Sequence, residues 1–259
     1  MSTTLPQEMQ QHTYAIMDEV EGSHWWFVGR RAILESFLKR IVGSLASLDA
    51  DKSVGAPLRI LDVGCGTGAN IEMLSQFGEA EGVDVSDDAL EFCRRKGLKV
   101  QKGLAETLPY GDKTFELTTA LDVIEHLDDD VAGLKEMFRV TKGGGYSLFF
   151  VPAFMWLWGV QDDISNHRIR YTRRQIVERI EQAGYKVERA TYANWTFFPP
   201  ILAGRTLMKL TGIKPESENN INVSALNGIF GKLFSAERFW LKHFNFPIGV
   251  SIVVVAKKD

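Results

Sequence analysis

Apolar runs and amphipathic segments alternate along the middle of the chain. Short apolar runs are typical of strands buried on both faces, whereas apolar residues three and four positions apart are typical of helices. Strands are predicted at 58–63, 80–85, 98–103, 115–122, 146–152 and 185–193. Helices are predicted at 69–77, 86–97, 128–142 and 172–184, with a glycine turn at 143–145. This alternation predicts an α/β fold built on a doubly wound, mostly parallel sheet.

The rest of the chain is predicted to add to this core, which spans residues 58–193. Residues 1–57 form an N-terminal helical cap and linker, because their apolar residues recur at helical spacing. Residues 194–247 are expected to form a helical insert on the substrate side. Residues 248–259 then supply the final strand of the core sheet, which would have seven strands.

The insert is apolar and mildly basic, which leaves three interpretations open. It can be a lid over a bulky acceptor, a homodimer surface, or a peripheral contact with a membrane, since aromatic and basic residues together suit an interfacial helix. All six tryptophans lie outside residues 58–150, so the aromatic surface belongs to the additions and not to the regular core.

Composition narrows the class of protein. The chain has 259 residues with a net charge of −3, so nothing indicates binding to nucleic acid. Its two cysteines, Cys65 and Cys93, support neither a disulfide framework nor a zinc site, and no metal is predicted. The N-terminus lacks the order of a signal peptide, and no apolar run approaches the ~20 residues of a membrane span. A cytoplasmic protein is expected.

A glycine-rich loop follows the first predicted core strand. Gly64, Gly66 and Gly68 come directly after Asp62, and Asp84 ends the next strand. The spacing is one residue short of the dinucleotide fingerprint, and a carboxylate beside the loop would repel a pyrophosphate. A ligand with an ammonium group would instead be attracted, and an acidic residue after the second strand suits a ribose. These features predict a nucleoside with a cationic tail, which describes S-adenosylmethionine (SAM).

Four ordered stretches, "LDVGCGTG", "GVDVS", "GLAETLPYGDKTFELTTALDVIEHL" and "GGGYSLFFVPA", resemble the class I SAM-dependent methyltransferase family. The resemblance implies a Rossmann-like enzyme that uses SAM and releases S-adenosylhomocysteine. Its expected acceptor is an oxygen or nitrogen of a small molecule, bulky or lipid-like. A non-catalytic SAM-binding protein and an NAD-linked oxidoreductase are the alternatives.

The resemblance also implies which residues hold the cofactor. The glycine loop would pass beneath the methionine part, and Asp62 would orient the loop or the amino group. Asp84 would bind the ribose, and Ala105 would offer a backbone N–H to adenine. Before the core, an arginine would pair with the carboxylate and a tryptophan would cover the sulfonium. The implied set is Trp26, Arg30, Asp62, Gly64, Cys65, Gly66, Gly68, Asp84, Val85, Ala105, Glu106, Leu121 and Asp122.

Two polar clusters are candidates for the chemistry, which needs a base only if the acceptor arrives protonated. Glu125 and His126 follow the fourth strand, although they can equally serve a helix start and packing. His167 lies in "QDDISNHRIRYTRR", after the fifth strand, where a solvated loop is the competing interpretation. His167 is favoured as base or acceptor contact, with Arg168, Arg170 or Tyr171 gripping the acceptor. Trp156, Trp158 and Trp195 are further predicted acceptor contacts, and Tyr171 a further catalytic candidate.

Overall fold

A seven-stranded sheet forms the centre of the protein, in the order β3-β2-β1-β4-β5-β7-β6. The computed structural model describes residues 11–48, 57–212 and 224–259. The strands are β1 (Arg59–Val63), β2 (Glu79–Asp84), β3 (Val100–Lys102), β4 (Phe115–Leu121), β5 (Thr141–Pro152), β6 (Lys186–Ala193) and β7 (Ser251–Lys257). Only β7 is antiparallel to its neighbours, β5 and β6. The predicted doubly wound, mostly parallel sheet is therefore confirmed.

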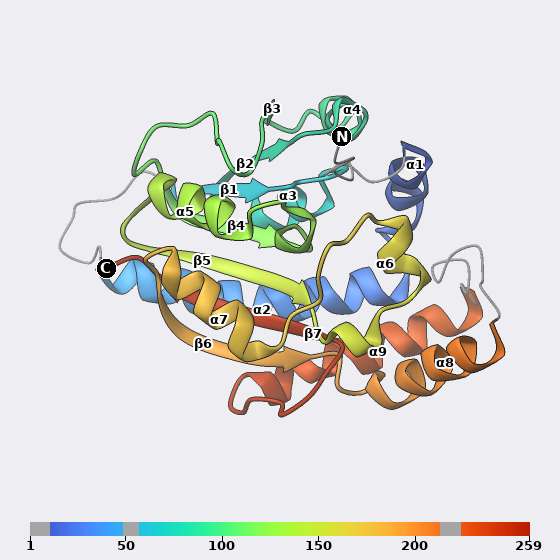
Figure 1. Cartoon of the computed structure of the whole chain (residues 1–259). Coiled ribbons are helices and arrows are strands. Elements are labelled where there is room, and N and C mark those ends of the chain that lie inside the picture. The colour runs from blue at the N-terminus through green and yellow to red at the C-terminus, as the bar shows by residue number, and fades with distance from the viewer. Residues whose placement is uncertain (1–10, 49–56, 213–223) are drawn as a thin grey trace.

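Helices cover both faces of this sheet (Figure 1). Figure 1 shows α5 and α7 on one face, and α2 with α9 on the other. The helices are α1 (Gln11–Val20), α2 (Trp25–Leu48), α3 (Ala69–Leu74), α4 (Asp87–Arg95), α5 (Asp130–Val140), α6 (Val160–Ile164), α7 (Arg173–Gln182), α8 (Phe198–Thr211) and α9 (Ser224–Leu241). Two 3-10 turns, η1 (Ile124–His126) and η2 (Met155–Leu157), follow β4 and β5. The order of strands and helices agrees with the order predicted from the sequence.

Local signals explain where several helices begin and end. The hydroxyl of Ser86 accepts a hydrogen bond from the backbone of Ala89 and caps α4. At the start of α7, Thr172 and Gln175 form the predicted capping box. After it, Gly184 has a φ of 106°, which an L side chain rarely adopts. These termini fix the length of the connections that lead back to the sheet.

Two predicted helix ends are wrong, and a β-bulge explains the first of them. The helix expected to reach residue 142 ends at Val140, and the glycines at 143–145 lie within β5. Thr141 pairs with Phe115, and pairing with β4 then shifts before it resumes at Tyr146. Glycines suit this irregular stretch because a bulge leaves residues unpaired and locally twists the strand. The helix predicted at 69–77 is likewise shorter, ending at Leu74.

The N-terminal helices and the insert are joined by close packing. A Cβ on Gly29 of α2 would overlap the ring of Phe234 on α9, so the absence of a side chain lets the two helices approach. Phe234 is fully buried there. The described part of the insert contains the helices α8 and α9, and its residues 213–223 lie outside the described part, as do 1–10 and 49–56. Among the described helices, none combines the length and apolar character needed to cross a membrane.

Candidate active site

A cavity of about 720 Å³ opens beyond the carboxyl ends of β1, β2 and β4. Parallel open sheets bind ligands at this edge, where the strand order reverses. Its walls come from α1, α2, the glycine loop, η1, the segment that carries α6, and α8. The predicted site residues that line it are Trp26, Arg30, Gly64, Cys65, Gly66, Asp84, Val85, Ala105, Leu121, Asp122, His126, His167 and Arg170.

The glycine loop presents main chain to this cavity. Gly64 and Gly66 have φ values of 68° and 53°, in the left-handed region that favours glycine. The N–H of Gly64 donates to Val83 O of the neighbouring strand at 2.7 Å, which fixes the start of the loop. A Cβ on Gly64 would overlap Val123, so a side chain there would displace the residue that follows Asp122. The loop is a bare, rigid surface.

Gly68 has a different task from the one implied by the resemblance. It is the N-cap residue of α3, with a φ of 93°, and it does not line the cavity. A Cβ on it would overlap Leu98 and approach Cys93 Sγ to 3.0 Å. Gly68 therefore lets α3 start close to α4, while the two preceding glycines face the cavity.

Asp84 is oriented by backbone donors at the tip of β2. Its Oδ2 accepts from Gly66 N and its Oδ1 from Ser86 N, both at 2.9 Å. The carboxylate thus ties the glycine loop to the start of α4 and still borders the cavity, beside Val85. Each carboxylate oxygen can accept more than one bond, so this geometry is compatible with a ribose hydroxyl as an additional donor.

Asp62 lies beneath the loop and not on the cavity wall. It is 1% exposed, and its Oδ1 accepts from Thr119 Oγ1 at 2.6 Å. Its Oδ2 has no hydrogen-bond partner among the described residues. Burial raises the pKa of this carboxyl to about 7, and the bond from Thr119 only partly offsets that effect. The hydrogen bond of Asp62 thus goes to β4, and its predicted role toward the loop or the amino group stays a prediction.

Arg30 joins α2 to the tip of β4. Its guanidinium pairs with Asp122 Oδ2 and donates to Asn70 Oδ1 at 3.1 Å. It also lies over the ring of Trp26, 4.9 Å from the centroid. Burial raises the pKa of Asp122, although the charge of Arg30 opposes that rise. Arg30 reaches the cavity as predicted, but in this structure its bonds go to protein side chains.

Trp25 and Trp26, which are neighbours at the start of α2, both line the cavity. Trp26 borders Phe150, whereas Trp25 packs against Phe197 and Phe234 of the insert. The pair stands at the first turn of α2, where the cavity wraps around the helix end. At the position predicted for adenine, Ala105 lines the cavity and Glu106 does not.

α1 contributes a wall that was not foreseen. Thr13, Tyr14 and Met17 of α1 line the cavity, together with Glu21 just after the end of the helix. Glu21 accepts from Thr67 Oγ1 of the glycine loop at 2.6 Å, and burial raises its pKa despite this bond. Nothing in the spacing of α1 marks Glu21 as a site residue, because only the folded chain brings α1 onto the loop.

At the opposite end of the cavity, His167 is held by a buried carboxylate. His167 Nδ1 and Asp162 Oδ1 are 2.8 Å apart, and the same oxygen accepts from Arg170 Nη1 at 2.7 Å. Burial opposes ionisation of Asp162, but the hydrogen bond with His167 and the charge of Arg170 hold its pKa well below the usual range. Arg170 is anchored by Ala153 O at 2.8 Å. The sequence singled out His167 and Arg170 but not Asp162 as the group that links them.

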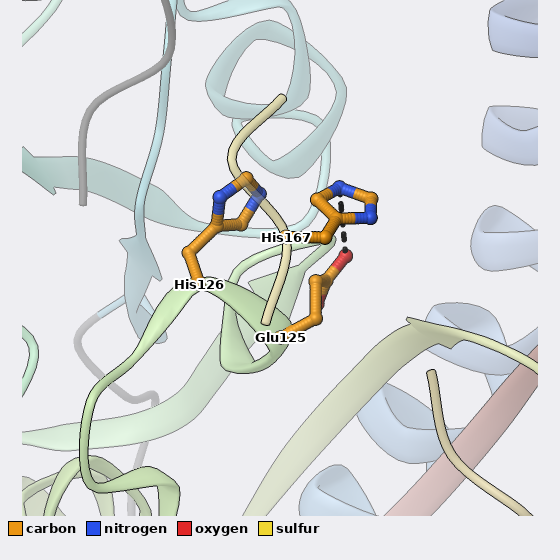
Figure 2. A group of neighbouring side chains, drawn as sticks. All are labelled: Glu125, His126 and His167. Atoms are coloured by element: carbon orange, nitrogen blue, oxygen red, sulfur yellow. Dashed lines mark ion pairs between the residues drawn. The ribbon is translucent and has the colours of Figure 1, made fainter. Parts of the chain in front are cut away.

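Glu125, His126 and His167 converge on one point (Figure 2). Glu125 is fully buried, and neither of its carboxylate oxygens has a hydrogen-bond partner among the described residues. Burial, together with the charge of Asp122, raises its pKa well above the usual range. Burial lowers the pKa of His126 to about 3. The two histidine rings meet edge to face, 4.7 Å apart.

Several predicted contacts lie away from the cavity. Tyr171 is fully buried and donates to Asp130 Oδ2 at 2.9 Å, which holds α5 against the segment before α7. Arg168 pairs with Asp128 at 2.8 Å, which agrees with a role in a solvated loop better than with a role in binding the acceptor. The tryptophans Trp156, Trp158 and Trp195 do not line the cavity; Trp158 bonds Asp163, and Trp195 stacks on Phe246. Residues Phe197, Ile201 and Met208 of the insert are the observed apolar wall instead.

This seven-stranded sheet, with β7 antiparallel between β5 and β6, has the Rossmann-like fold of solved methyltransferases. Residues 61–149 match the family described as a methyltransferase domain. A demethylmenaquinone methyltransferase of Chlorobaculum parvum is 32% identical over 98 residues, 36% of this chain and 41% of that protein. A fatty-acid O-methyltransferase of Mycolicibacterium smegmatis is 35% identical over 98 residues, 35% of this chain and 36% of that protein.

The whole fold also has a solved counterpart. A SAM-dependent methyltransferase from Thermotoga maritima, described as a possible histamine N-methyltransferase, superposes with a TM-score of 0.54 at 20% identity, over 95% of this chain and 97% of that one. The chain spans about two fifths of the length of the curated relatives it matches, from 36 to 43%. Residues 61–149 therefore match a methyltransferase domain, and the fold around them is the one found in SAM-dependent methyltransferases.

Proposed function

We propose that the protein transfers a methyl group from SAM to an oxygen or nitrogen of a small, largely apolar molecule. The observation that carries this proposal is the arrangement of one cavity with two unlike ends. One end offers bare main chain from Gly64 to Gly66 with Asp84 beside it, and the other offers His167 on a buried carboxylate. A single cavity that joins both ends can hold a cofactor and an acceptor in line.

The residues at the cofactor end fit SAM. The left-handed glycines leave space that a side chain would fill, and the oriented carboxylate of Asp84 suits a ribose. Arg30 and Asp122 place both signs of charge where an amino acid tail with a carboxylate and an ammonium would lie. Bound SAM supplies an already activated methyl group on a sulfonium, so the protein has mainly to orient both reactants and exclude water.

At the acceptor end, His167 is the residue best placed to take a proton. Asp162 fixes the ring through Nδ1, which leaves Nε2 directed toward Glu125 at 3.9 Å. A histidine held by a carboxylate keeps one tautomer and stabilises the positive charge that follows protonation. His167 would therefore accept the acceptor's hydroxyl or ammonium proton as the new bond forms.

The apolar wall favours a bulky acceptor. Trp25, Phe197, Ile201 and Met208 line the cavity on the side away from the glycine loop. Two matched relatives are named for a demethylated menaquinone and for fatty acids, which are apolar acceptors. Apolar cavity walls bind such molecules by removing them from water. We therefore infer an acceptor with one polar, methylatable group on a lipophilic body.

The insert serves as a lid in this proposal. α8 supplies Pro200, Ile201, Gly204, Arg205 and Met208 to the cavity wall, so an acceptor must pass along it. Its outer side, and that of α9, exposes large apolar side chains: Leu207, Leu210, Ile229, Leu233, Phe239 and Trp240. A membrane or a second copy of the chain could cover them. Flotation with anionic liposomes separates these readings, because a membrane contact alone brings the protein to the lipid fraction.

Product formation tests the proposal. The protein is incubated with SAM and a panel of quinols, phenols and fatty acids, and S-adenosylhomocysteine and methylated acceptor are quantified together by mass spectrometry. Equal amounts of both products are expected for at least one acceptor, with a strong loss in His167→Gln. A protein that binds SAM yet forms neither product with any acceptor class would favour the non-catalytic alternative. Binding of NAD without binding of SAM would favour the oxidoreductase.

A further inference from the structure

We propose that Glu125, His126 and His167 form a binding site for one divalent transition-metal ion, of which Zn²⁺ is the best match. No metal was expected from the sequence, because its cysteines offer no zinc pattern. Glu125 and His126 are neighbours in the chain, whereas His167 follows about forty residues later, and only the fold brings it to the other two (Figure 2).

The convergence of ligand atoms is the first argument. One nitrogen from each histidine and one carboxylate oxygen of Glu125 all lie within 4.8 Å of one another. His167 Nε2 and Glu125 Oε1 are 3.9 Å apart. In a zinc site with bonds of about 2.0–2.2 Å, such atoms are roughly 3–3.5 Å apart, so modest side-chain rotations would close the set. Two histidines and one glutamate are also a donor set found in catalytic zinc sites.

Unmet polar groups are the second argument. Glu125 has no exposed surface, and both of its oxygens lack a hydrogen-bond partner among the described residues. The Nδ1 atom of His126, a side chain that is 9% exposed, lacks one as well. Buried polar groups are normally paired, and a buried carboxylate without a partner is costly. A cation at the point of convergence would satisfy the buried carboxylate of Glu125.

The support around His167 is the third argument. Asp162 Oδ1 lies 2.8 Å from His167 Nδ1, and Arg170 Nη1 holds the same oxygen at 2.7 Å. Metal-binding histidines almost always donate their second N–H to a carboxylate or a carbonyl, which fixes the ring and the tautomer. This arrangement leaves the lone pair of Nε2 to coordinate a metal ion, and Nε2 is the nitrogen that faces Glu125.

Such an ion would have an open position toward the acceptor, because His126 and His167 both line the cavity. This role rests on the proposed function, whereas metal binding itself does not. With the ion bound, His167 Nε2 would be a ligand and no longer the base. The ion would bind the acceptor hydroxyl and lower its pKa, and the hydroxyl proton would pass to water. The oxygen then forms a bond with the methyl carbon, while the methyl–sulfur bond breaks and its electron pair stays on the sulfur of S-adenosylhomocysteine. Oxygen thereby becomes the preferred acceptor atom.

The experiment titrates chelator-stripped protein with Zn²⁺ in competition with a chromogenic chelator. One Zn²⁺ per chain is expected for the wild type and for His243→Gln, a matched control because His243 is exposed at the end of α9. Glu125→Gln and His167→Gln should bind Zn²⁺ about 100-fold more weakly or not at all. Asp162→Asn, which alters a positioning residue, should weaken binding about 10- to 100-fold.

SAM affinity, measured by calorimetry on each variant, shows that the variants are folded and separates the two proposals. Absence of stoichiometric Zn²⁺ binding in the wild type would overturn the metal site, as would equal binding in Glu125→Gln, His167→Gln and the control. Zn²⁺ binding without any SAM binding would leave the metal site standing and overturn the proposed function. If Zn²⁺ binds but its removal leaves turnover unchanged, the role in deprotonation is overturned.

Discussion

The two ends of the cavity are built in opposite ways. At the cofactor end, the contacts are made by main chain: Gly64 and Gly66 are fixed by Val83 O and by the carboxylate of Asp84. At the acceptor end, side chains from distant segments meet, and the buried oxygens of Glu125 have no partner among the described residues. The main chain of the glycine loop is fixed without a ligand, whereas at the second end the carboxylate of Glu125 is left without a partner among the described residues.

This difference separates binding from chemistry. Groups already paired within the protein give a rigid surface that recognises one cofactor, and glycines keep that surface free of side chains. Groups left unpaired in a buried place are costly for folding but available to a reacting molecule or an ion. Substitutions at the two ends should therefore affect different measurements, and each prediction below tests that separation.

The largest effect is expected at the acceptor end. His167→Gln removes the group that would accept a proton or bind the ion, so turnover should fall by roughly 10²- to 10⁴-fold. SAM affinity should stay within about twofold of the wild type, because the two ends share no hydrogen bond among the described residues. Steady-state kinetics and calorimetry measure the two quantities, with His243→Gln as the control. An equal loss in both would show that the ends are not separate.

Gly64→Ala should have the next largest effect, and at the cofactor end. The new Cβ would overlap Val123, and the residue would be held at a φ of 68°. SAM affinity should fall by about 100-fold, since the loop must move to relieve the clash. Gly97→Ala is the matched control: its φ is 72°, but no atom lies within 4 Å of the added carbon. It should cost only about 1 kcal/mol of stability. Similar SAM affinities in both variants would contradict the close-approach argument.

The stability of the cofactor-free protein should depend on Asp62. Its pKa is about 7 in the folded protein and near 3.8 in the unfolded chain, so the folded state binds the proton more tightly. Its stabilising contribution is therefore present below pH 4 and is lost as pH rises through 7. Between pH 5 and pH 8 the wild type should lose roughly 2–3 kcal/mol more unfolding free energy than Asp62→Asn. If urea denaturation gave the same pH dependence of the unfolding free energy for both proteins, the raised pKa of Asp62 would be contradicted.

A smaller effect is expected for Arg30→Ala. It removes the partner of Asp122 and Asn70, which border the region assigned to the amino acid tail of SAM. We expect SAM affinity to fall about tenfold, in line with the loss of charge-assisted hydrogen bonds. Arg31→Ala is the comparison, because Arg31 donates to Glu21 O and does not border the cavity. Unchanged affinity in Arg30→Ala would remove this residue from the cofactor site.

Sequence reasoning found the cofactor end because its features are local. The glycine loop and Asp84 sit at the ends of consecutive parallel strands, and topology alone brings such residues to one edge. The α/β order and the capping signals are local as well, which is why the sheet was predicted with few errors. The bulge in β5 escaped prediction because it depends on how β4 and β7 pair with that strand.

The acceptor end was found only in part. His167 was singled out from a dense polar segment, but the same density suggested Arg168 and Tyr171, which bond Asp128 and Asp130 instead. Glu21, just after α1, carries no signal of its own in the sequence. Side chains that meet through tertiary packing can be assigned to a site only when the packing is known. For the same reason, residue type alone did not show that Trp156, Trp158 and Trp195 lie outside the cavity wall.

The central claim is that the cavity beyond β1 and β2 binds SAM on bare main chain. Isothermal titration of the wild-type protein with S-adenosylhomocysteine, and separately with NAD, tests it most directly. The account predicts one S-adenosylhomocysteine bound per chain, no heat with NAD, and a greatly weakened titration in Gly64→Ala. Absence of binding by the wild type, or binding of NAD in its place, would contradict it.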